Sequence, residues 1–232
     1  GGFARLTRDG NGDGIPEGAF PSPTVADLDH DGVMEIIAGT WDQLVYALRI
    51  DGSQFWHLDY DPTDPFEFGF KTGDTIWTTP AFADIDADGR DEVVLGTDAH
   101  YFPWGHQIPF QQRDGGLLVT LDGISGRLEY GPGRFFNESY HPEGAGWYYD
   151  PAGENHIPVN NISQVLQSSP VIADVDADGY FEIVHGTGQR FYRPTDDRHA
   201  RVFCWNAENA TQRWATFVED EVFASPAIAN VD

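Results

Sequence analysis

Cysteine is nearly absent from this sequence: Cys204 is the only one among 232 residues, so no internal disulfide can form. Basic residues are also few, with 13 Lys and Arg against 38 Asp and Glu and a formal charge of −25. This balance excludes a nucleic-acid partner and an anionic membrane surface, because both are bound through clustered positive charge. No apolar run reaches the roughly eighteen residues of a membrane-spanning helix, so we expect no membrane insertion.

The acidic residues are concentrated in a repeated motif of alternating aspartates, a glycine, a glutamate and an apolar run. Complete copies begin at Ser22, Thr79 and Ser169 as SPTVADLDHDGVMEIIAGT, TPAFADIDADGRDEVVLGT and SPVIADVDADGYFEIVHGT. A partial copy, SPAIANVD, begins at Ser225. The first acids lie at 27, 84 and 174, and Asn230 takes this place in the partial copy, which gives spacings of 57, 90 and 56 residues. Such spacings indicate an array of supersecondary units.

The crowded carboxylates of each copy predict a structural calcium site. Without a cation they would repel one another, whereas Ca²⁺ accepts several carboxylate and carbonyl oxygens in uneven geometry. Gly32 and its equivalents permit the tight turn that brings the next carbonyl toward the ion. An EF-hand loop begins in the same way but places its glutamate later, between two helices. The candidate ligands are Asp27, Asp29, Asp31, the Val33 carbonyl and Glu35; Asp84, Asp86, Asp88, the Arg90 carbonyl and Glu92; and Asp174, Asp176, Asp178, the Tyr180 carbonyl and Glu182.

Two further stretches extend this prediction to three or four calcium sites. DGNGDGIPE precedes the first repeat and offers Asp9, Asn11, Asp13, the Ile15 carbonyl and Glu17. The alternative for this stretch is a solvated Asp/Gly linker. The partial copy offers Asn230 and Asp232.

Each repeat predicts four short strands, so the fold class is all-β. In the first repeat these are TVAD, EIIAG, LVYAL (44–48) and QFWHLD (54–59). The last two strands are LLVTLD and RLEY in the second repeat, and RVFCWN and QRWAT in the third. The EIIAG, EVVLG and EIVHG strands are apolar without alternation, which indicates that both faces are covered. Four-stranded antiparallel repeats that are arranged radially form a β-propeller.

The motif SPxxADxDxDGxxEIxxGT resembles the FG-GAP/VCBS repeat of integrin-α-like propellers, and LVYALRIDGSQFWHL resembles PQQ-type propeller repeats. The resemblance covers roughly residues 20–60, 77–130 and 167–216. It implies a propeller, commonly of about seven blades, with calcium in the loop that joins strands one and two. Three complete blades and parts of flanking blades are then present. The rest of such a ring would come from the same longer chain or from another subunit.

The corresponding division of the chain has seven segments. They are 1–21, the end of a preceding blade with its Asp/Gly calcium loop; 22–60, the first blade; 61–78, a connection; 79–130, the second blade with a long loop insertion; 131–168, a long aromatic loop; 169–217, the third blade; and 218–232, the start of the next blade.

Up-and-down strand order predicts two functionally different ends of the blades. The calcium loops and tight turns share one end, and the long connections 59–78, 98–115, 131–168 and 188–199 share the other. These connections are rich in aromatic, His and Arg residues, which suit a protein or glycan ligand. Alternatively, the aromatic side chains form a local core that holds the connections down. The histidines lack the spacing of a transition-metal site.

Three functions are compatible with these features. The first is a calcium-stabilised binding, adhesion or assembly module of a secreted or cell-surface protein, because weak calcium loops suit an extracellular setting. The second is a polysaccharide lyase that resembles rhamnogalacturonan lyases, although no spacing marks a catalytic base. The third is a quinoprotein dehydrogenase, which the single cysteine disfavours because that family often uses a vicinal disulfide. Cys204 is expected to be a buried strand thiol and His185 a hydrogen-bonded core residue.

Overall fold

The computed structural model describes residues 18–57, 69–72, 75–97, 117–127, 147–148, 166–187, 200–209 and 211–230. These residues contain twelve β-strands and no helix. Within them there is accordingly no helix of the length and apolarity that a membrane crossing needs. The predicted all-β class is therefore confirmed.

The strands form three separate four-stranded antiparallel sheets. Blade A contains β1 (Thr24–Ala26), β2 (Glu35–Gly39), β3 (Leu44–Leu48) and β4 (Phe70–Lys71). Blade B contains β5 (Ala81–Ala83), β6 (Glu92–Thr97), β7 (Leu117–Asp122) and β8 (Trp147–Tyr148). Blade C contains β9 (Val171–Ala173), β10 (Glu182–Gly186), β11 (Ala200–Asn206) and β12 (Gln212–Val218). In every blade the strands are paired in chain order, which is the up-and-down arrangement of a propeller blade.

The register of the first two strands is the same in all three blades. The loop glutamate pairs with the alanine that ends the preceding strand: Glu35 with Ala26, Glu92 with Ala83, and Glu182 with Ala173. The acidic loop therefore begins and ends at equivalent points of each sheet.

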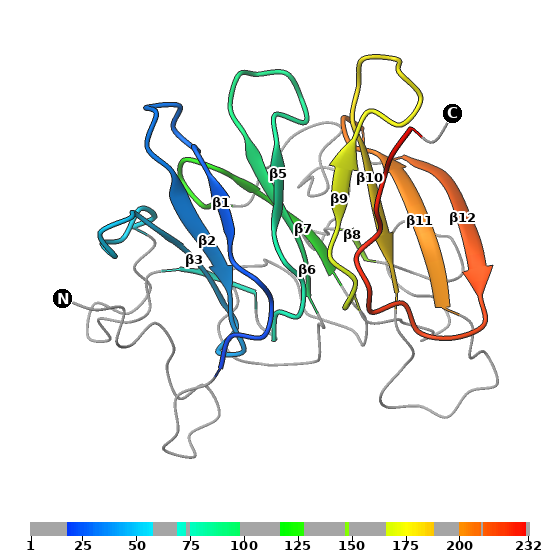
Figure 1. Cartoon of the computed structure of the whole chain (residues 1–232), viewed down its shortest axis with the longest axis horizontal. Helices are drawn as coiled ribbons and strands as arrows, with labels where there is room; N and C mark the ends of the chain where they lie inside the picture. Colours follow the sequence, from blue (N-terminus) through cyan, green and yellow to red (C-terminus); the bar gives the residue numbers. More distant parts are fainter. Residues whose placement is uncertain are drawn as a thin grey trace, which may run out of the picture.

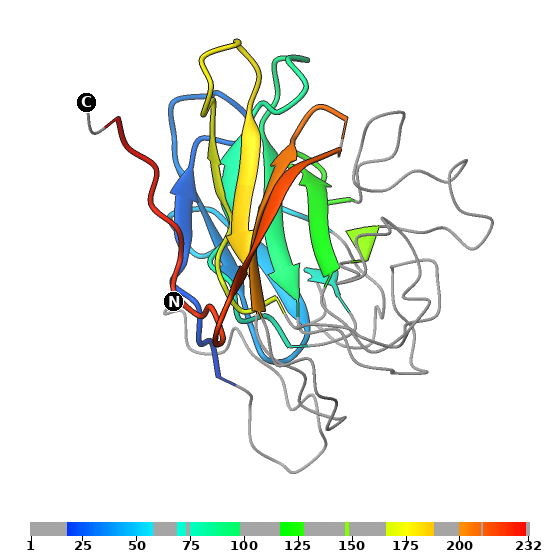
Figure 2. The same cartoon turned by 90° about the vertical axis from the view of Figure 1, so that its right-hand side faces the viewer.

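The blades lie side by side and are joined through their first strands. Thr24 Oγ1 donates a hydrogen bond to the Pro80 carbonyl at 2.5 Å, and the Thr79 amide donates to Ser169 Oγ at 2.8 Å. Figures 1 and 2 show the three acidic loops projecting from the same end of the sheets. This common orientation confirms that the loops share one end of the blades.

The Gly-Thr pair that closes each motif is where the following repeat packs. A Cβ placed on Gly39 would lie 2.5 Å from Ile76, and one placed on Gly186 would lie 2.3 Å from Val222. The amides of Ile76 and Val222 also donate to the carbonyls of Thr40 and Thr187, at 3.2 and 3.0 Å. Val222 of the last segment thus contacts blade C as Ile76 contacts blade A.

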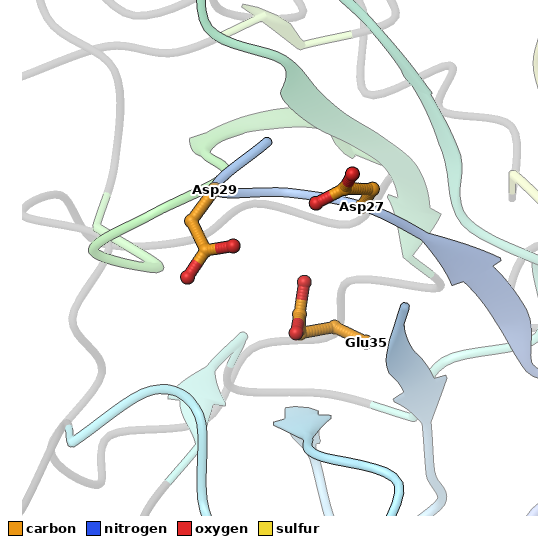
Figure 3. A group of neighbouring side chains, drawn as sticks. All are labelled: Asp27, Asp29 and Glu35. Atoms are coloured by element: carbon orange, nitrogen blue, oxygen red, sulfur yellow. The ribbon is translucent and has the colours of Figure 1, made fainter. Parts of the chain in front are cut away.

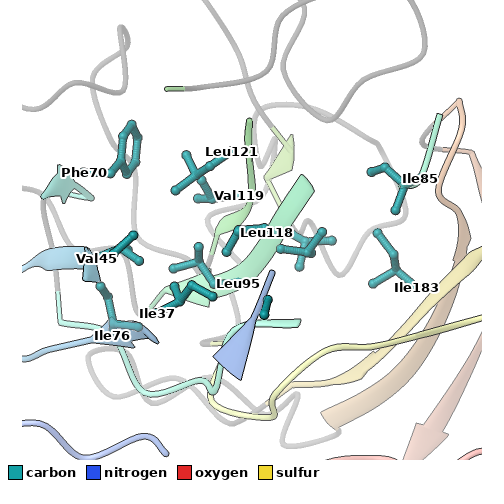
Figure 4. Packing of buried hydrophobic residues seen from close by; sticks show 14 of the residues in the cluster. Ile37, Val45, Phe70, Ile76, Ile85, Leu95, Leu118, Val119, Leu121 and Ile183 are labelled. Atoms are coloured by element: carbon teal, nitrogen blue, oxygen red, sulfur yellow. The ribbon is translucent and has the colours of Figure 1, made fainter. Parts of the chain in front are cut away.

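The hydrophobic core lies between neighbouring blades and runs from blade A to blade C. Figure 4 shows Ile37 and Val45 of blade A near Leu95 and Leu118 of blade B. Strands β3 and β10 are buried at every position, whereas β2 alternates between buried and half-buried residues. Two-sided burial explains why these strands lack a polar face in the sequence.

The fourth strand was predicted wrongly in blade A. Of the predicted strand 54–59, residues 54–57 are described: Gln54 bridges to Leu48, and the Phe55 amide donates to the Ala47 carbonyl at 2.8 Å. The strand that pairs with Leu44 and Val45 is β4, beyond the predicted boundary at residue 60. The side chains of Phe55 and Trp56 are buried in the core, with exposed fractions of 7% and 1%, so the pairing with β3 stops after these two residues.

Blade B shows the same difference. Its fourth strand is β8, which pairs with Leu117 and Leu118 and lies inside the segment 131–168 predicted as a loop. Of the predicted strand 127–130, Arg127 closes the preceding turn by accepting the Asp122 amide, and 128–130 lie outside the described residues. In blade C the predicted strand is confirmed as β12.

Candidate metal centres

Two positions of each acidic loop adopt left-handed backbone conformations. The glycines predicted at the turn do so, with φ of 88° at Gly32, 91° at Gly89 and 93° at Gly179. The residue two positions earlier also does so, with φ of 57° at His30, 61° at Ala87 and 62° at Ala177. Sequence analysis did not single out this second position, because neither Ala nor His marks a left-handed residue as Gly does.

The first aspartate of each loop holds this turn together. Asp27 accepts the Asp31 amide on Oδ1 and the Gly32 amide on Oδ2, both at 3.0 Å. Asp84 and Asp174 make the same pair of bonds in blades B and C. These bonds hold the turn from the first aspartate to the glycine in the same shape in all three loops.

Three of the four predicted carboxylates converge in every loop. One oxygen each of Asp27, Asp29 and Glu35 lies within 4.8 Å of the others, as it does in the equivalent triads of blades B and C. Figure 3 shows the three side chains of blade A facing a common space. The two equivalent triads are Asp84, Asp86 and Glu92, and Asp174, Asp176 and Glu182.

The third aspartate of each loop lies outside these triads. Asp31 accepts the Val33 amide at 2.7 Å, and Asp88 and Asp178 accept the amides of Arg90 and Tyr180 at 2.9 Å. The three amide donors are exposed residues. Coordination through their carbonyl oxygens stays a prediction.

The loop glutamate is buried, unlike the aspartates around it. Glu35 is 2% exposed, and its Oε2 accepts the Leu28 amide at 3.0 Å. Burial raises the pKa of Glu35, and the charges of Asp29, Asp31 and Asp27 raise it further. Glu92 and Glu182 are equally buried and accept the amides of Ile85 and Val175 at 2.9 Å. A buried carboxylate among other carboxylates is stable as an ion only beside a cation.

The chemistry of this donor set fits a hard divalent cation. All three groups are carboxylates, and neither sulfur nor imidazole belongs to any triad. Such all-oxygen sets suit Ca²⁺ or Mg²⁺, and the uneven arrangement of loop oxygens favours Ca²⁺. In blade A, Asp27, Asp29 and Glu35 would hold the ion.

Of the remaining predicted ligands, Asn230 is the one that the structure describes. Asn230 is exposed, and its copy of the motif forms no strand over residues 225–230. Asp232 and the whole predicted site at Asp9, Asn11, Asp13, Ile15 and Glu17 lie outside the described residues.

Two charged residues near the triads were missed by sequence analysis. Asp91 directly precedes Glu92 of the blade B triad. Burial raises the pKa of Asp91, the charge of His30 lowers it, and the charges of Asp84 and Asp27 raise it. Arg213 of β12 forms ion pairs with Glu182, at 2.6 Å, and with Asp176. The hydrogen bond from Arg213 lowers the pKa of Asp176. Arg213 is 31 residues from Glu182 in the chain, so no local pattern announces the contact.

Most of the long connections lie outside the described residues, but three aromatic rings meet at that end of the blades. Phe20 lies before β1, Trp41 in the β2–β3 turn and Trp77 before β5. The ring centroids are 5.9 Å apart for Phe20 and Trp41, 5.2 Å for Phe20 and Trp77, and 5.0 Å for the two tryptophans. Phe20 is 66% exposed, so the cluster reaches the surface.

The two residues expected to be structural are both buried in blade C. His185 accepts a hydrogen bond from Trp205 Nε1 on its Nε2 at 2.9 Å and stacks on Phe203. Cys204 is buried, and burial raises the pKa of its thiol to about 11. Both expectations are confirmed.

No family model and no curated protein matches the chain. Similar solved structures include a rhamnogalacturonan lyase of Bacillus licheniformis, with 17% identity over 89% of this chain and 35% of that one at a TM-score of 0.47. Another is the rhamnogalacturonan lyase YesW, with 16% identity; the match covers 87% of this chain and 34% of that one, at a TM-score of 0.48. A third is a quinohemoprotein alcohol dehydrogenase of Comamonas testosteroni, also with 16% identity; the match covers 87% of this chain and 21% of that one, at a TM-score of 0.42. The chain spans about a third or less of the lengths of these proteins.

Proposed function

We propose that this chain is part of a calcium-stabilised β-propeller that serves as a binding or assembly module of a secreted or cell-surface protein. The observation that carries the proposal is the threefold repetition of one carboxylate triad at the same register of three blades. A single acidic turn is common on protein surfaces, but a repeated triad with a buried glutamate has a shared structural purpose.

Calcium in these loops would be structural. Each triad connects the end of a first strand to the start of a second, so a bound ion joins two strands of one blade. The ion also offsets the repulsion among the carboxylates and the cost of burying Glu35 and its equivalents. At a free calcium concentration about a hundredfold above Kd, each site would add about 2.7 kcal/mol to the free energy of unfolding.

The opposite end of the blades is the proposed ligand face. Phe20, Trp41 and Trp77 form an aromatic cluster there, contributed by segments next to strands of blades A and B. Aromatic faces at the surface suit the apolar side of a sugar ring or an apolar anchor of a partner protein. The calcium loops would thus keep the scaffold rigid, and the other end would provide the contacts.

The test combines metal analysis with thermal unfolding in calcium and in EDTA. We expect bound calcium and a large fall in Tm on chelation. Glu35→Gln should lose one bound ion and part of the calcium-dependent rise in Tm, because it removes a charged ligand. Glu219→Gln removes the same charge from an exposed position outside the loops and should change neither quantity. A chain that binds no calcium and melts at the same temperature in EDTA would overturn the proposal.

The polysaccharide-lyase alternative has no specific observation in its favour within the described part of the chain. The histidine and arginine candidates of the long connections, and their tyrosines other than Tyr148 of β8, lie outside the described residues. The same holds for the quinoprotein alternative. Incubation of the full-length parent protein with acidic polysaccharides, followed by ultraviolet detection of unsaturated products, separates the lyase from the binding module.

A further inference from the structure

The acidic loop of blade C already contains a cation from its own chain. Arg213 Nη1 lies 2.6 Å from Glu182 Oε1, and Nη2 is paired with Asp176 Oδ2. Glu182 and Asp176 are two of the three carboxylates of the blade C triad. The guanidinium therefore binds the triad through two separate carboxylates, one of them 1% exposed.

Arg213 lies between Gln212 and Trp214, at the register shift in the β11–β12 pairing, and blade A has a different residue at the corresponding position. In blade C, Ile183 pairs with Trp205, which pairs with Gln212. In blade A, Ile36 pairs with Leu48, which pairs with Gln54. Gln54 therefore corresponds to Gln212, and Phe55 corresponds to Arg213.

Phe55 cannot replace the cation of blade C. Its side chain is buried in the core at 7% exposure, and no ion pair to Asp27, Asp29 or Glu35 is present among the described residues. Blade B is aligned with blade C by the hydrogen bond that closes the turn after the third strand, which runs from the Asp122 amide to the Arg127 carbonyl in blade B and from the Asn206 amide to the Thr211 carbonyl in blade C. Arg127 therefore corresponds to Thr211. Glu129 then corresponds to Arg213 and lies outside the described residues. An arginine stands at this position only in the third repeat of the sequence.

We infer that Arg213 takes the place of calcium in the blade C loop, so that this loop stays closed without the metal while the blade A loop requires it. The inference rests on the proposed function, since it assumes that the blade A triad binds calcium. Calcium can enter the blade C triad only when Arg213 withdraws, because two cations at one triad repel each other. Withdrawal breaks two charge-assisted hydrogen bonds, which lowers the calcium affinity of this loop.

The acidic loops of blades A and C would therefore respond differently to the free calcium concentration. A calcium-dependent loop closes or opens with the free calcium concentration, whereas a loop held by Arg213 is closed at every concentration. Blade C would therefore keep its first hairpin in low calcium, and blade A would be the part of the scaffold that responds to the ion.

Hydrogen exchange of the unmodified chain tests this without a variant. The Leu28 amide donates to Glu35 in blade A, and the Val175 amide donates to Glu182 in blade C. After chelation we expect the protection of Leu28 to fall about tenfold or more, while that of Val175 changes by less than about twofold. Equal losses at the two amides would overturn the inference and leave the proposed function intact. No change at either amide, together with no bound calcium, would remove the proposed function itself.

A variant supplies the second test. Arg213→Met keeps an unbranched, largely apolar stem and removes the guanidinium and its charge. Calorimetric titration with calcium should then show an added or tightened site, about tenfold or more stronger than in the parent chain. Arg201→Met is the matched control, because Arg201 belongs to the same sheet but pairs in register with Phe217, away from the triad. An Arg213→Met protein that is folded and binds calcium as the parent does would also overturn the inference.

Discussion

The indole Nε1 of Trp56 donates a hydrogen bond to the carbonyl of Gly123 at 2.8 Å, across 67 residues of chain. Trp56 follows the third strand of blade A, and Gly123 begins the turn after β7 of blade B. The same indole covers Gly126, where an added Cβ would lie 2.3 Å from the ring and φ is +68°. One side chain thus joins two blades by a polar bond and by close packing.

Replacement of this residue should destabilise the interface between blades A and B. In Trp56→Phe the Gly123 carbonyl loses its donor in a buried site and the core loses ring volume, so we expect a loss of about 1–3 kcal/mol in the free energy of unfolding. Denaturant unfolding in calcium measures it. Trp214→Phe, at a 46% exposed residue of β12, is the control and should have little effect. Similar losses in the two variants would contradict this role of Trp56.

Gly39 should not tolerate even a methyl group. A Cβ at this position would lie 2.5 Å from Ile76 Cγ2, so the segment before β5 must move away from blade A. We expect Gly39→Ala to lower the free energy of unfolding by about 1–3 kcal/mol, as overpacking of a core does. Gly18→Ala is the matched control, because nothing lies within 4 Å of its added Cβ. A neutral Gly39→Ala would show that the blades are not packed so closely.

The hydroxyl of Thr78 should be as important as its shape. Its Oγ1 donates to the Gly96 carbonyl at 2.7 Å and accepts the Gly96 amide at 2.8 Å, both in buried surroundings. Thr78→Val keeps the shape and leaves two buried backbone groups unpaired, so we expect a loss of about 1–3 kcal/mol or more. Thr216→Val, at an exposed position of β12, is the control. Thermal unfolding of the pair in calcium decides whether the loss is confined to Thr78.

His185 should make the protein less stable in acid. Burial lowers the pKa of His185 to about 4 from its model-peptide value of 6.5, so the unfolded chain binds the extra proton first. The free energy of unfolding is not affected by this titration above pH 6.5. Between pH 6.5 and pH 4 it falls, and the loss reaches about 3 kcal/mol at pH 4.

The measurement is the difference in unfolding free energy between the parent chain and His185→Leu across this pH range. Leucine occupies the equivalent position 95 of blade B, so the variant imitates a neighbouring blade. The difference should change with pH for His185→Leu and stay constant for His57→Gln, at an exposed histidine. A constant difference for His185→Leu would show that folding does not change the pKa of this ring, and would contradict the prediction.

The sequence by itself determined the repeating unit of this protein. Alternating Asp, the turn glycine and the buried glutamate are local features, since the turn of each loop is shaped by hydrogen bonds within a few residues of Asp27 or its equivalents. The second and third strands of the repeat are also predictable from local sequence, because continuous apolar runs bounded by turns specify buried strands. For this reason β2 and β3 begin and end at the predicted residues.

The tertiary structure alone decided which segment completes each blade and which charges meet. QFWHLD has the composition of a strand, but the core between two blades takes up Phe55 and Trp56 more favourably than a sheet edge does, and β4 pairs in their place. Arg213 forms its ion pair with Glu182 from the register shift between Gln212 and Trp214 in the β11–β12 pairing. Both outcomes depend on contacts between residues distant in the chain, whose free energy becomes available only when the sheets have packed together.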